Sequence, residues 1–403
     1  MGTRGDPSPC GPVTQAANMN SIYLDNNATT PLAPVARDAM QPYLSERFGN
    51  PASGHSFGRQ ARKALEDARE QIADVLHAHP DEVLFTSGAT EANNLAIFGL
   101  PGAAPGAIVT SAIEHPCVLE PIAQLQRRGF TRIDLPTDEF GQIDLSTIPI
   151  PGDARLIAMM LANHETGAIQ PVNALANLLH GHIPFHCDAA AAAGKMAISF
   201  RELGVATLTI SAHKFHGPKG IGALLVRKNV KLRPLVFGGH QQQGKRPGTE
   251  PVALAVGMAA ALAWSIKNLD AHRAQLAELR QRFLDHLRRH VAPILLNGPE
   301  HDGLPHALNV SFPGCKADAL LMSLDLAGVA CSTGSACSSG SLLPSPVLTA
   351  MGKTGDVLHS AMRFSLSPLL NALEIDDAAK KIADCVARLR RVCEDDLPGK
   401  HAS

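Results

Sequence analysis

Short apolar runs alternate with longer amphipathic stretches over the first half of the chain. The apolar runs are typical of buried strands, which we predict at residues 82–86, 107–111, 156–161, 183–187 and 207–211. Amphipathic segments between them predict helices, of which the clearest are residues 58–76, 118–128 and 172–179. Strands that alternate with helices in this way predict an α/β domain built on a largely parallel sheet.

The pattern changes after residue 250. A helix-rich stretch over residues 251–290 leads to predicted strands at 307–312, 329–332 and 362–366, set among helices. This order predicts a smaller α+β domain. We therefore expect a disordered tail over residues 1–20, a large domain over 21–265 and a small domain over 266–403, with residues 21–35 a candidate to pack against the small domain.

Composition narrows the class of protein. The chain has 403 residues with 36 Lys+Arg against 37 Asp+Glu, so no basic field for nucleic acid or a membrane surface is expected. Its 8 cysteines are scattered without a Cys-x-x-Cys pair, which disfavours a zinc ribbon or a disulfide scaffold and predicts a reducing, cytoplasmic location. The apolar stretch 252–264 is shorter than the roughly 18 residues of a membrane span.

Polar residues follow each predicted strand of the large domain, and ligands bind beyond the carboxyl ends of strands in such sheets. The most informative ending is Ser211-Ala212-His213-Lys214. A partly desolvated amine beside imidazoles is shifted toward its neutral, nucleophilic form, as a Schiff-base lysine requires. Lys214 is equally compatible with a surface position before a Gly-Pro turn. The residues at the other strand ends must therefore decide between a Schiff-base lysine and a surface lysine.

Three of those endings supply complementary groups. Ser87-Gly88-Ala89-Thr90 has the form of a glycine turn opening a helix, which favours a phosphate but also fits an ordinary capped helix. Asp188 would hold a ring nitrogen or cap a helix, and His115 would stack on a planar ring or simply end a strand. A Schiff-base lysine, an acid for a pyridinium and a phosphate cup together meet the requirements of pyridoxal phosphate.

A downstream Ser/Gly-rich stretch, residues 331–341, carries Cys337. Its composition is typical of a solvated loop, and Ser345-Pro346 after it is typical of a helix start. Cys187 and Cys385 fit the role of unreactive cysteines packed in the core, but Cys337, in a solvated loop, does not. No Lys or Arg in the loop indicates how its thiolate would be stabilised.

Taken together, these motifs resemble the cysteine desulfurases, the NifS/IscS-like branch of the class V aminotransferases, which are fold type I pyridoxal phosphate enzymes. The resemblance covers about residues 22–390. It is carried by Asp25-Asn26-Asn27-Ala28-Thr29-Thr30-Pro31, Asn50-Pro51, Thr86-Ser87-Gly88-Ala89-Thr90-Glu91, Glu114-His115, Asn163-His164-Glu165-Thr166-Gly167, Ser211-Ala212-His213-Lys214, Arg246-Pro247-Gly248-Thr249, Gly334-Ser335-Ala336-Cys337 and Arg363-Phe364-Ser365.

The resemblance implies a role for each cofactor-binding position. Lys214 would form the Schiff base and later move the proton of the substrate Cα. Asp188 would pair with the pyridine nitrogen, and His115 would stack on the ring and act in catalysis. The phosphate would be held by Ala89, Thr90, Ser211 and His213, and by Thr249 of the partner subunit in a homodimer.

The resemblance also implies the reaction. Asn163 and Arg363 would bind the carboxylate of L-cysteine, and Cys337 would attack the substrate sulfur, leaving a persulfide and releasing L-alanine. The loop of Cys337 resembles the loop in the branch of the family that transfers sulfur to an acceptor protein, such as an iron–sulfur scaffold, or supplies it for tRNA thiolation. No metal ligand is implied.

Three positions depart from the family pattern. Ala191 stands where the family usually has a glutamine that donates to the cofactor's phenolic oxygen, a loss of about 1.5–3 kcal/mol locally. His164 replaces a common asparagine, and Leu343 replaces a usual glutamate after the loop.

Alternatives remain open at this point. A selenocysteine lyase, or another lyase or transaminase of the same fold, would share most of these motifs. A sulfur carrier or scaffold with a decayed site is supported by Ala191 alone. A metal protein is suggested by His180, His182 and His186, but Pro184 prevents a helical ligand face there.

Overall fold

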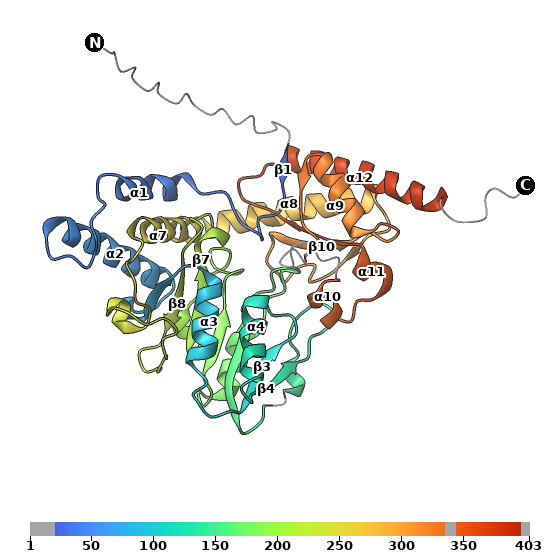
Figure 1. Ribbon diagram of the computed structural model, residues 1–403. Helices are drawn as coiled ribbons and strands as arrows, with labels where there is room; N and C mark the ends of the chain where they lie inside the picture. The colour runs from blue at the N-terminus through green and yellow to red at the C-terminus, as the bar shows by residue number, and fades with distance from the viewer. Residues whose placement is uncertain (1–20, 149, 335–343, 396–403) are drawn as a thin grey trace, which may run out of the picture.

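The computed structural model describes residues 21–148, 150–334 and 344–395 of the chain (Figure 1). The predicted tail over residues 1–20 lies outside this part, as do Cys337 and Leu343. The folded part has a large α/β region, at the left and bottom of Figure 1, and a smaller region at its upper right.

A seven-stranded sheet forms the centre of the large region, in the order β2-β8-β7-β6-β5-β3-β4. Its strands are β2 (Val83–Thr86), β3 (Ala107–Ser111), β4 (Thr131–Leu135), β5 (Ala154–Met160), β6 (Phe185–Asp188), β7 (Thr207–Ser211) and β8 (Gly222–Val226). Only β8 runs against its neighbours, β2 and β7. The predicted α/β fold with a mostly parallel sheet is therefore confirmed, and the five predicted strands fall within two residues of β2, β3, β5, β6 and β7.

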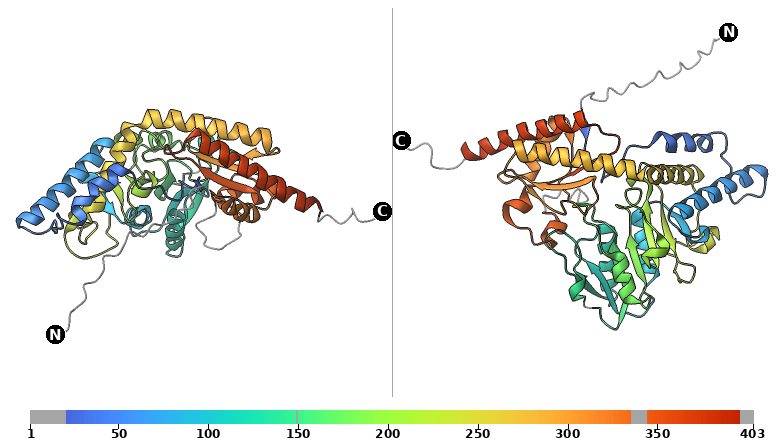
Figure 2. Two further views of the ribbon diagram at one scale, coloured as in Figure 1. Left: turned by 90° about the horizontal axis from the view of Figure 1, so that it is seen from above. Right: turned by 180° about the vertical axis from the view of Figure 1, so that it is seen from behind.

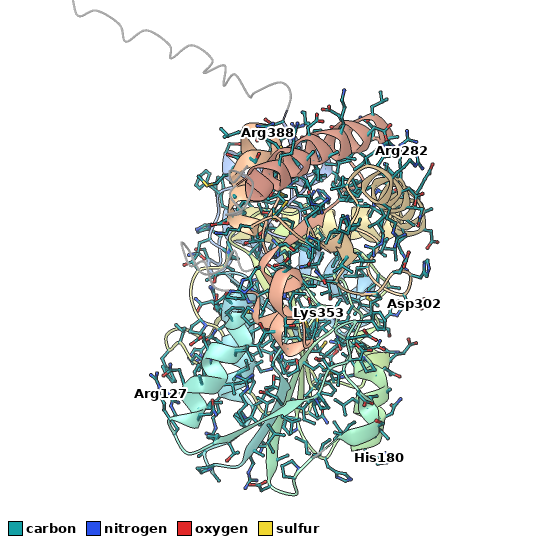
Figure 3. All side chains as sticks on the ribbon, turned by 90° about the vertical axis from the view of Figure 1, so that its right-hand side faces the viewer. Arg127, His180, Arg282, Asp302, Lys353 and Arg388 are labelled. Atoms are coloured by element: carbon teal, nitrogen blue, oxygen red, sulfur yellow. The ribbon has the colours of Figure 1, made fainter. Side chains whose placement is uncertain are left out.

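Helices cover both faces of this sheet because the strand residues alternate between two cores. Val83 and Phe85 of β2 pack in one core, whereas Leu84 between them packs in the other. The first core is covered by α1 (Pro34–Leu44), α2 (Ser56–Val75), α5 (Val172–Leu179), α6 (Phe200–Leu203) and α7 (Val252–Lys267), and the second by α3 (Ala89–Gly99) and α4 (Pro116–Gln126). Figure 3 shows this arrangement end-on, with Arg127 after α4 and His180 after α5 on opposite flanks.

The small region has its own core around an antiparallel sheet in the order β12-β10-β9. Its elements are α8 (Leu269–His290), β9 (Leu295–Leu296), β10 (Ala307–Ser311), α9 (Ala317–Leu326), β11 (Val329–Ala330), α10 (Pro346–Ala350), α11 (Gly355–His359), β12 (Ala361–Ser365) and α12 (Ala372–Asp395). The long helices α8 and α12 lie side by side, as both views of Figure 2 show. Phe364 anchors the core between Phe283 and Phe312, with ring centroids 5.3 Å and 6.3 Å away.

The start of the described chain joins this small region. β1 (Ile22–Tyr23) pairs in parallel with β11, and Asp25 bridges to Ser365 at the end of β12. The chain then crosses to the large region, where Ala33 donates its backbone N–H to the carbonyl of His216. This crossing segment reaches the site described below.

Across the described residues, no single helix combines the length and apolarity needed to cross a bilayer; only α7 and α8 together pass that test, as a pair bent by 70°.

Candidate active site

A cavity of about 560 Å³ opens at the carboxyl ends of β6 and β7, the size of a typical small-molecule site. Most of the predicted site residues line it, from five separate segments: Ala89, Thr90, His115, Asp188, Ser211, His213, Lys214 and Arg363. The strand-end argument therefore located one crevice. Asn163 and Thr249 do not line it.

One end of the cavity is shaped as an anion cup. Gly88 precedes α3 with φ of +155°, a conformation that side chains strongly disfavour. The backbone there also passes close to β8, because a Cβ on Gly222 would stand 2.9 Å from the Gly88 Cα. Ser211 is buried, and its hydroxyl has no hydrogen-bond partner among the described residues. Free N–H groups of a helix start facing an unpartnered hydroxyl suit a phosphate.

A chain of buried hydrogen bonds holds Asp188 on the floor of the cavity. Its Oδ2 accepts from Nδ2 of Asn93 at 2.7 Å, and its Oδ1 accepts from the N–H of Ala190 at 2.9 Å. The Asn93 amide oxygen lies 3.0 Å from Nε2 of His186, whose Nδ1 lies 2.9 Å from the Thr207 hydroxyl. The carboxylate is thus fixed in orientation, as a partner for a ring nitrogen must be.

His115 caps the start of α4 and faces the same cavity. Its Nδ1 accepts the backbone N–H of Cys117 at 3.1 Å, and the Cys117 thiol lies 2.9 Å from the same nitrogen. Burial lowers the pKa of His115, opposed by the charge of Asp188 and assisted by that of Lys214. The neutral ring therefore carries its proton on Nε2, the nitrogen away from the helix.

Lys214 lies on a single helical turn, Ala212–Lys214, directly after β7. Its amine donates to the backbone carbonyl of Asn27 and to that of Ala28, at 3.2 Å in the second case. Burial, followed by the charges of Lys214 and Lys219, lowers the pKa of His213 to about 4, so this imidazole is neutral at pH 7. The lysine side chain is thus held in the cavity by hydrogen bonds to a segment that lies 187 residues earlier in the chain.

Two predicted substrate ligands have different surroundings. Arg363, on β12, donates from Nη2 to Asp25 at 2.8 Å, while its buried Nε has no partner among the described residues. Asn163 is 1% exposed, and its Oδ1 accepts the N–H groups of Glu165 and Thr166 while its Nδ2 donates to the carbonyl of Ile113. Its carboxamide stabilises the turn behind the cavity and does not point into it.

Thr249 is exposed on the loop before α7, outside the cavity of its own chain. Ala191 does line the cavity, at the position where the resemblance implies a glutamine. His164 is partly buried, with its ring centroid 5.2 Å from that of His115.

Both flanks of the loop that carries Cys337 meet one buried carboxylate. Oε2 of Glu165 accepts the Ser345 hydroxyl at 2.6 Å, and a Cβ added to Gly334 would stand 2.5 Å from the same oxygen. Burial raises the pKa of Glu165, while the Ser345 hydrogen bond opposes that rise. Glu165 follows His164, which lines the cavity, so the two ends of the loop are held beside the site.

Several cavity residues were not among the predicted site residues, notably Asn27, Thr29, Cys117 and Lys219. Asn93 behind the cavity was also missed. Its signal was present, because asparagine is unfavourable within an apolar helix such as α3 unless its amide is used.

The histidines that suggested a metal site do not come together. His186 is fully buried and hydrogen-bonded to Thr207 and Asn93. No group of three or more His, Cys, Asp or Glu suited to a metal occurs within the residues that the structure describes.

Comparison with known proteins agrees with this geometry. The aminotransferase class-V family pattern matches residues 22–377. "Cysteine desulfurase IscS" of Dictyoglomus turgidum is 42% identical over 92% of this chain and 96% of its own length. Among solved structures, a "NIFS-LIKE PROTEIN" superposes with a TM-score of 0.85 at 34% identity, covering 91% of this chain and all of the other. "SspA in complex with cysteine" has a TM-score of 0.77 at 35% identity, covering 86% and 99%.

The chain belongs to the aminotransferase class-V family, and within it to the NifS/IscS-like branch of cysteine desulfurases. Its architecture is the fold type I arrangement, and its cofactor is pyridoxal phosphate. The residues present fit that group, because the unpartnered Ser211 hydroxyl and the Gly88 turn suit its phosphate and the fixed Asp188 carboxylate suits its ring nitrogen.

Proposed function

We propose that this chain converts L-cysteine to L-alanine and retains the sulfur as a persulfide on Cys337. The observation that carries the proposal is that Lys214, Asp188 and His115 line one cavity beside which both flanks of the Cys337 loop are held. Bound pyridoxal phosphate supplies an electron sink for a carbanion at the substrate Cα. The residues of the chain supply binding and proton transfer.

Lys214 is the proton carrier of the proposed reaction. Its amine takes the proton from the substrate Cα and returns one to the product carbon, which requires the neutral amine. Arg363 binds the substrate carboxylate through its buried Nε, the guanidinium being already oriented by Asp25. We leave Asn163 out of this role, because its carboxamide is engaged by the turn it stabilises.

The sulfur step is a displacement at the substrate sulfur. The Cys337 thiolate forms an S–S bond to the substrate sulfur. At the same time the bond between the substrate sulfur and the substrate Cβ breaks, and its electron pair stays with the carbon. Protonation of that carbon gives alanine. The balance is one cysteine and one enzyme thiol giving one alanine and one persulfide, without an external oxidant. Cys337 lies outside the described residues, so its placement is part of the proposal.

We also propose a cytoplasmic homodimer that hands sulfur to an acceptor protein for iron–sulfur assembly or tRNA thiolation. The exposed apolar residues Leu235, Val236 and Phe237, the last 82% exposed, precede the exposed Thr249 in one segment. Such a patch favours a contact with another subunit, from which Thr249 would reach the partner's phosphate cup. Substrate choice is supported by the similar solved protein described as in complex with cysteine.

The decisive test is incubation of the purified protein with L-cysteine. Alanine and protein-bound persulfide should form in equal amounts, and Cys337→Ser should abolish both. Cys331→Ser is the matched control, because this nearby thiol is partly buried and burial raises its pKa to about 12. Alanine release undiminished in Cys337→Ser would reject the persulfide role. Faster turnover of selenocysteine than of cysteine would indicate a selenocysteine lyase instead.

A further inference from the structure

A second, much smaller cavity lies behind Lys214. Its volume is about 30 Å³, which is enough for roughly one or two water molecules. Its ionisable lining consists of Lys195, Lys214, His216, His272, Arg273 and His306. Lys214 also lines the large cavity, so its side chain forms the partition between the two.

The small cavity is electrostatically one-sided. Among the described residues that line it, three are cationic, three are histidines and none is Asp or Glu. Lys195 donates from Nζ to the carbonyl of Ala191, its own turn, at 3.2 Å, and no salt bridge to Lys195 occurs in the described part of the chain. Its ammonium therefore stands near Lys214 without a compensating carboxylate in the cavity.

Burial lowers the pKa of all three histidines of this cavity, which favours their neutral forms. Burial lowers the pKa of His216 to about 4, and burial likewise holds the pKa of His306 well below its usual range. For Lys195, burial and then the charge of Lys214 lower the pKa to about 7. Lys195 is thus the group of this cavity whose pKa is shifted to near neutral pH.

Two buried acceptors point to solvent between these groups. Nδ1 of His306 and Oδ1 of Asn26 have no hydrogen-bond partner among the described residues, and both residues line the small cavity. Nε2 of His306 lies 2.7 Å from the Asn27 amide oxygen, so the neutral ring has its lone pair on Nδ1. A water molecule in the cavity can donate to both acceptors and accept from the Lys195 ammonium.

We propose that Lys195 is a positioning residue for the reaction, whose positive charge behind Lys214 favours the neutral form of the Lys214 amine. The inference rests on the proton-carrying role of Lys214 in the proposed function. Two neighbouring amines titrate as a pair, so a charge on one opposes a charge on the other. A proton that Lys214 takes from the substrate carbon is therefore passed on more readily than it would be from an isolated lysine.

Other ionisable groups also line the two cavities around Lys214, and their contributions are common to the enzyme and its Lys195 variants. On the side of the large cavity these are Glu91, His115, His164, Asp188, His213, Lys219 and Arg363. On the side of the small cavity they are His216, His272, Arg273 and His306.

The test is a spectrophotometric pH titration of the cofactor-loaded protein. The midpoint of the pH-dependent change in the visible absorption of the bound cofactor reports the protonation of the nitrogen of Lys214. In Lys195→Met this midpoint should rise by about one pH unit, the size expected for loss of one nearby charge. Lys195→Arg keeps the charge and should stay within about 0.3 units of the wild type. Lys228→Met, which removes an exposed charge elsewhere, should leave the midpoint unchanged.

A second measurement does not depend on a variant folding. Trace acetylation of the cofactor-free wild-type protein across pH, followed by mass spectrometry, gives the midpoint of Lys195 reactivity directly. An acetylation midpoint of Lys195 near the ordinary value for lysine would overturn the proposal. So would an absorption midpoint that is unshifted in Lys195→Met, or one that shifts equally in Lys195→Met and Lys195→Arg. Neither measurement needs sulfur transfer. The proposed desulfurase reaction can therefore fail while this inference stands, and this inference can fail while the desulfurase reaction stands.

Discussion

Replacing Glu114 by glutamine tests the electrostatics of the protein interior. Glu114 follows β3, is 3% exposed, and accepts at Oε1 from the N–H of Met160 at 2.7 Å and from the Ser111 hydroxyl at 3.3 Å. Its Oε2 has no partner among the described residues. Burial, assisted by the charge of Asp188 and opposed by those two hydrogen bonds, raises the pKa of Glu114 to about 8.

The sign of the pH dependence follows from this raised pKa. Between its ordinary value of 4.5 and about 8, the carboxyl is protonated in the folded chain and ionised in the unfolded one. Folding takes up a proton over that interval, so the free energy of unfolding falls by up to about 1.4 kcal/mol per pH unit. Above pH 8 the buried carboxyl costs about 5 kcal/mol relative to pH 4. Glutamine keeps the Oε1 acceptor and has no proton to release.

We therefore expect Glu114→Gln to gain stability over the wild type as pH rises, by about 3 kcal/mol between pH 6 and pH 8.5. Urea unfolding of both proteins at the two pH values, with and without cofactor, measures this difference. Any effect of the buried amide on the free energy of unfolding that does not depend on pH cancels when the values at the two pH values are subtracted. Glu120→Gln, on the exposed side of α4, is the control and should show no such trend. A difference between Glu114→Gln and wild type that does not grow with pH would refute the assignment of a protonated buried carboxyl.

Substitutions at three further residues test the site. Gly88→Ala should weaken cofactor affinity about tenfold or more, because φ of +155° costs an alanine at least about 1–2 kcal/mol; equilibrium dialysis measures this, and unchanged affinity would contradict it. Asn93→Ala should lower the free energy of unfolding by about 2–4 kcal/mol, since it leaves Asp188 Oδ2 unpaired in the interior; a loss below about 0.5 kcal/mol would count against the network. Glu165→Ala should slow single-turnover persulfide formation about tenfold while Glu165→Gln, which keeps the acceptor for Ser345, should slow it less; equal rates in both would mean that this contact does not position the loop.

The strand ends were predictable from the sequence because local patterns determine them. Each apolar run ends where its polar residues begin, and β3 and β7 have the predicted bounds. In a parallel sheet these ends meet at one edge, so Asp188 and Ser211 lie at the same edge of the sheet, where Asp188 pairs with Thr209 two residues before Ser211. The prediction needed only that these strands run parallel in one sheet.

The surroundings of Asn163 and Arg363 were not predictable in the same way. Asn163 looked available as a ligand, but its Oδ1 accepts the N–H groups two and three residues later, the local bonding typical of an Asx turn. Arg363 is oriented by Asp25, 338 residues earlier. Strand β8 was also missed, although it supplies Gly222 against the Gly88 turn. Contacts of such sequence separation leave no periodic signal.

The crossing segment shows how the small region reaches the chemistry of the large one. At its start, Asn26 donates from Nδ2 to the carbonyl of Ser365, and Asn27 donates its backbone N–H to the Ser365 hydroxyl, beside Arg363 on β12. A few residues later, Thr30 donates its hydroxyl to the carbonyl of His213, and the Asn27 carbonyl accepts from Lys214. The same short segment thus bonds both to the strand that carries the proposed carboxylate ligand and to the turn that carries the amine. Because these hydrogen bonds hold the segment at both ends, it ties the position of β12, which carries Arg363, to that of the turn that carries Lys214.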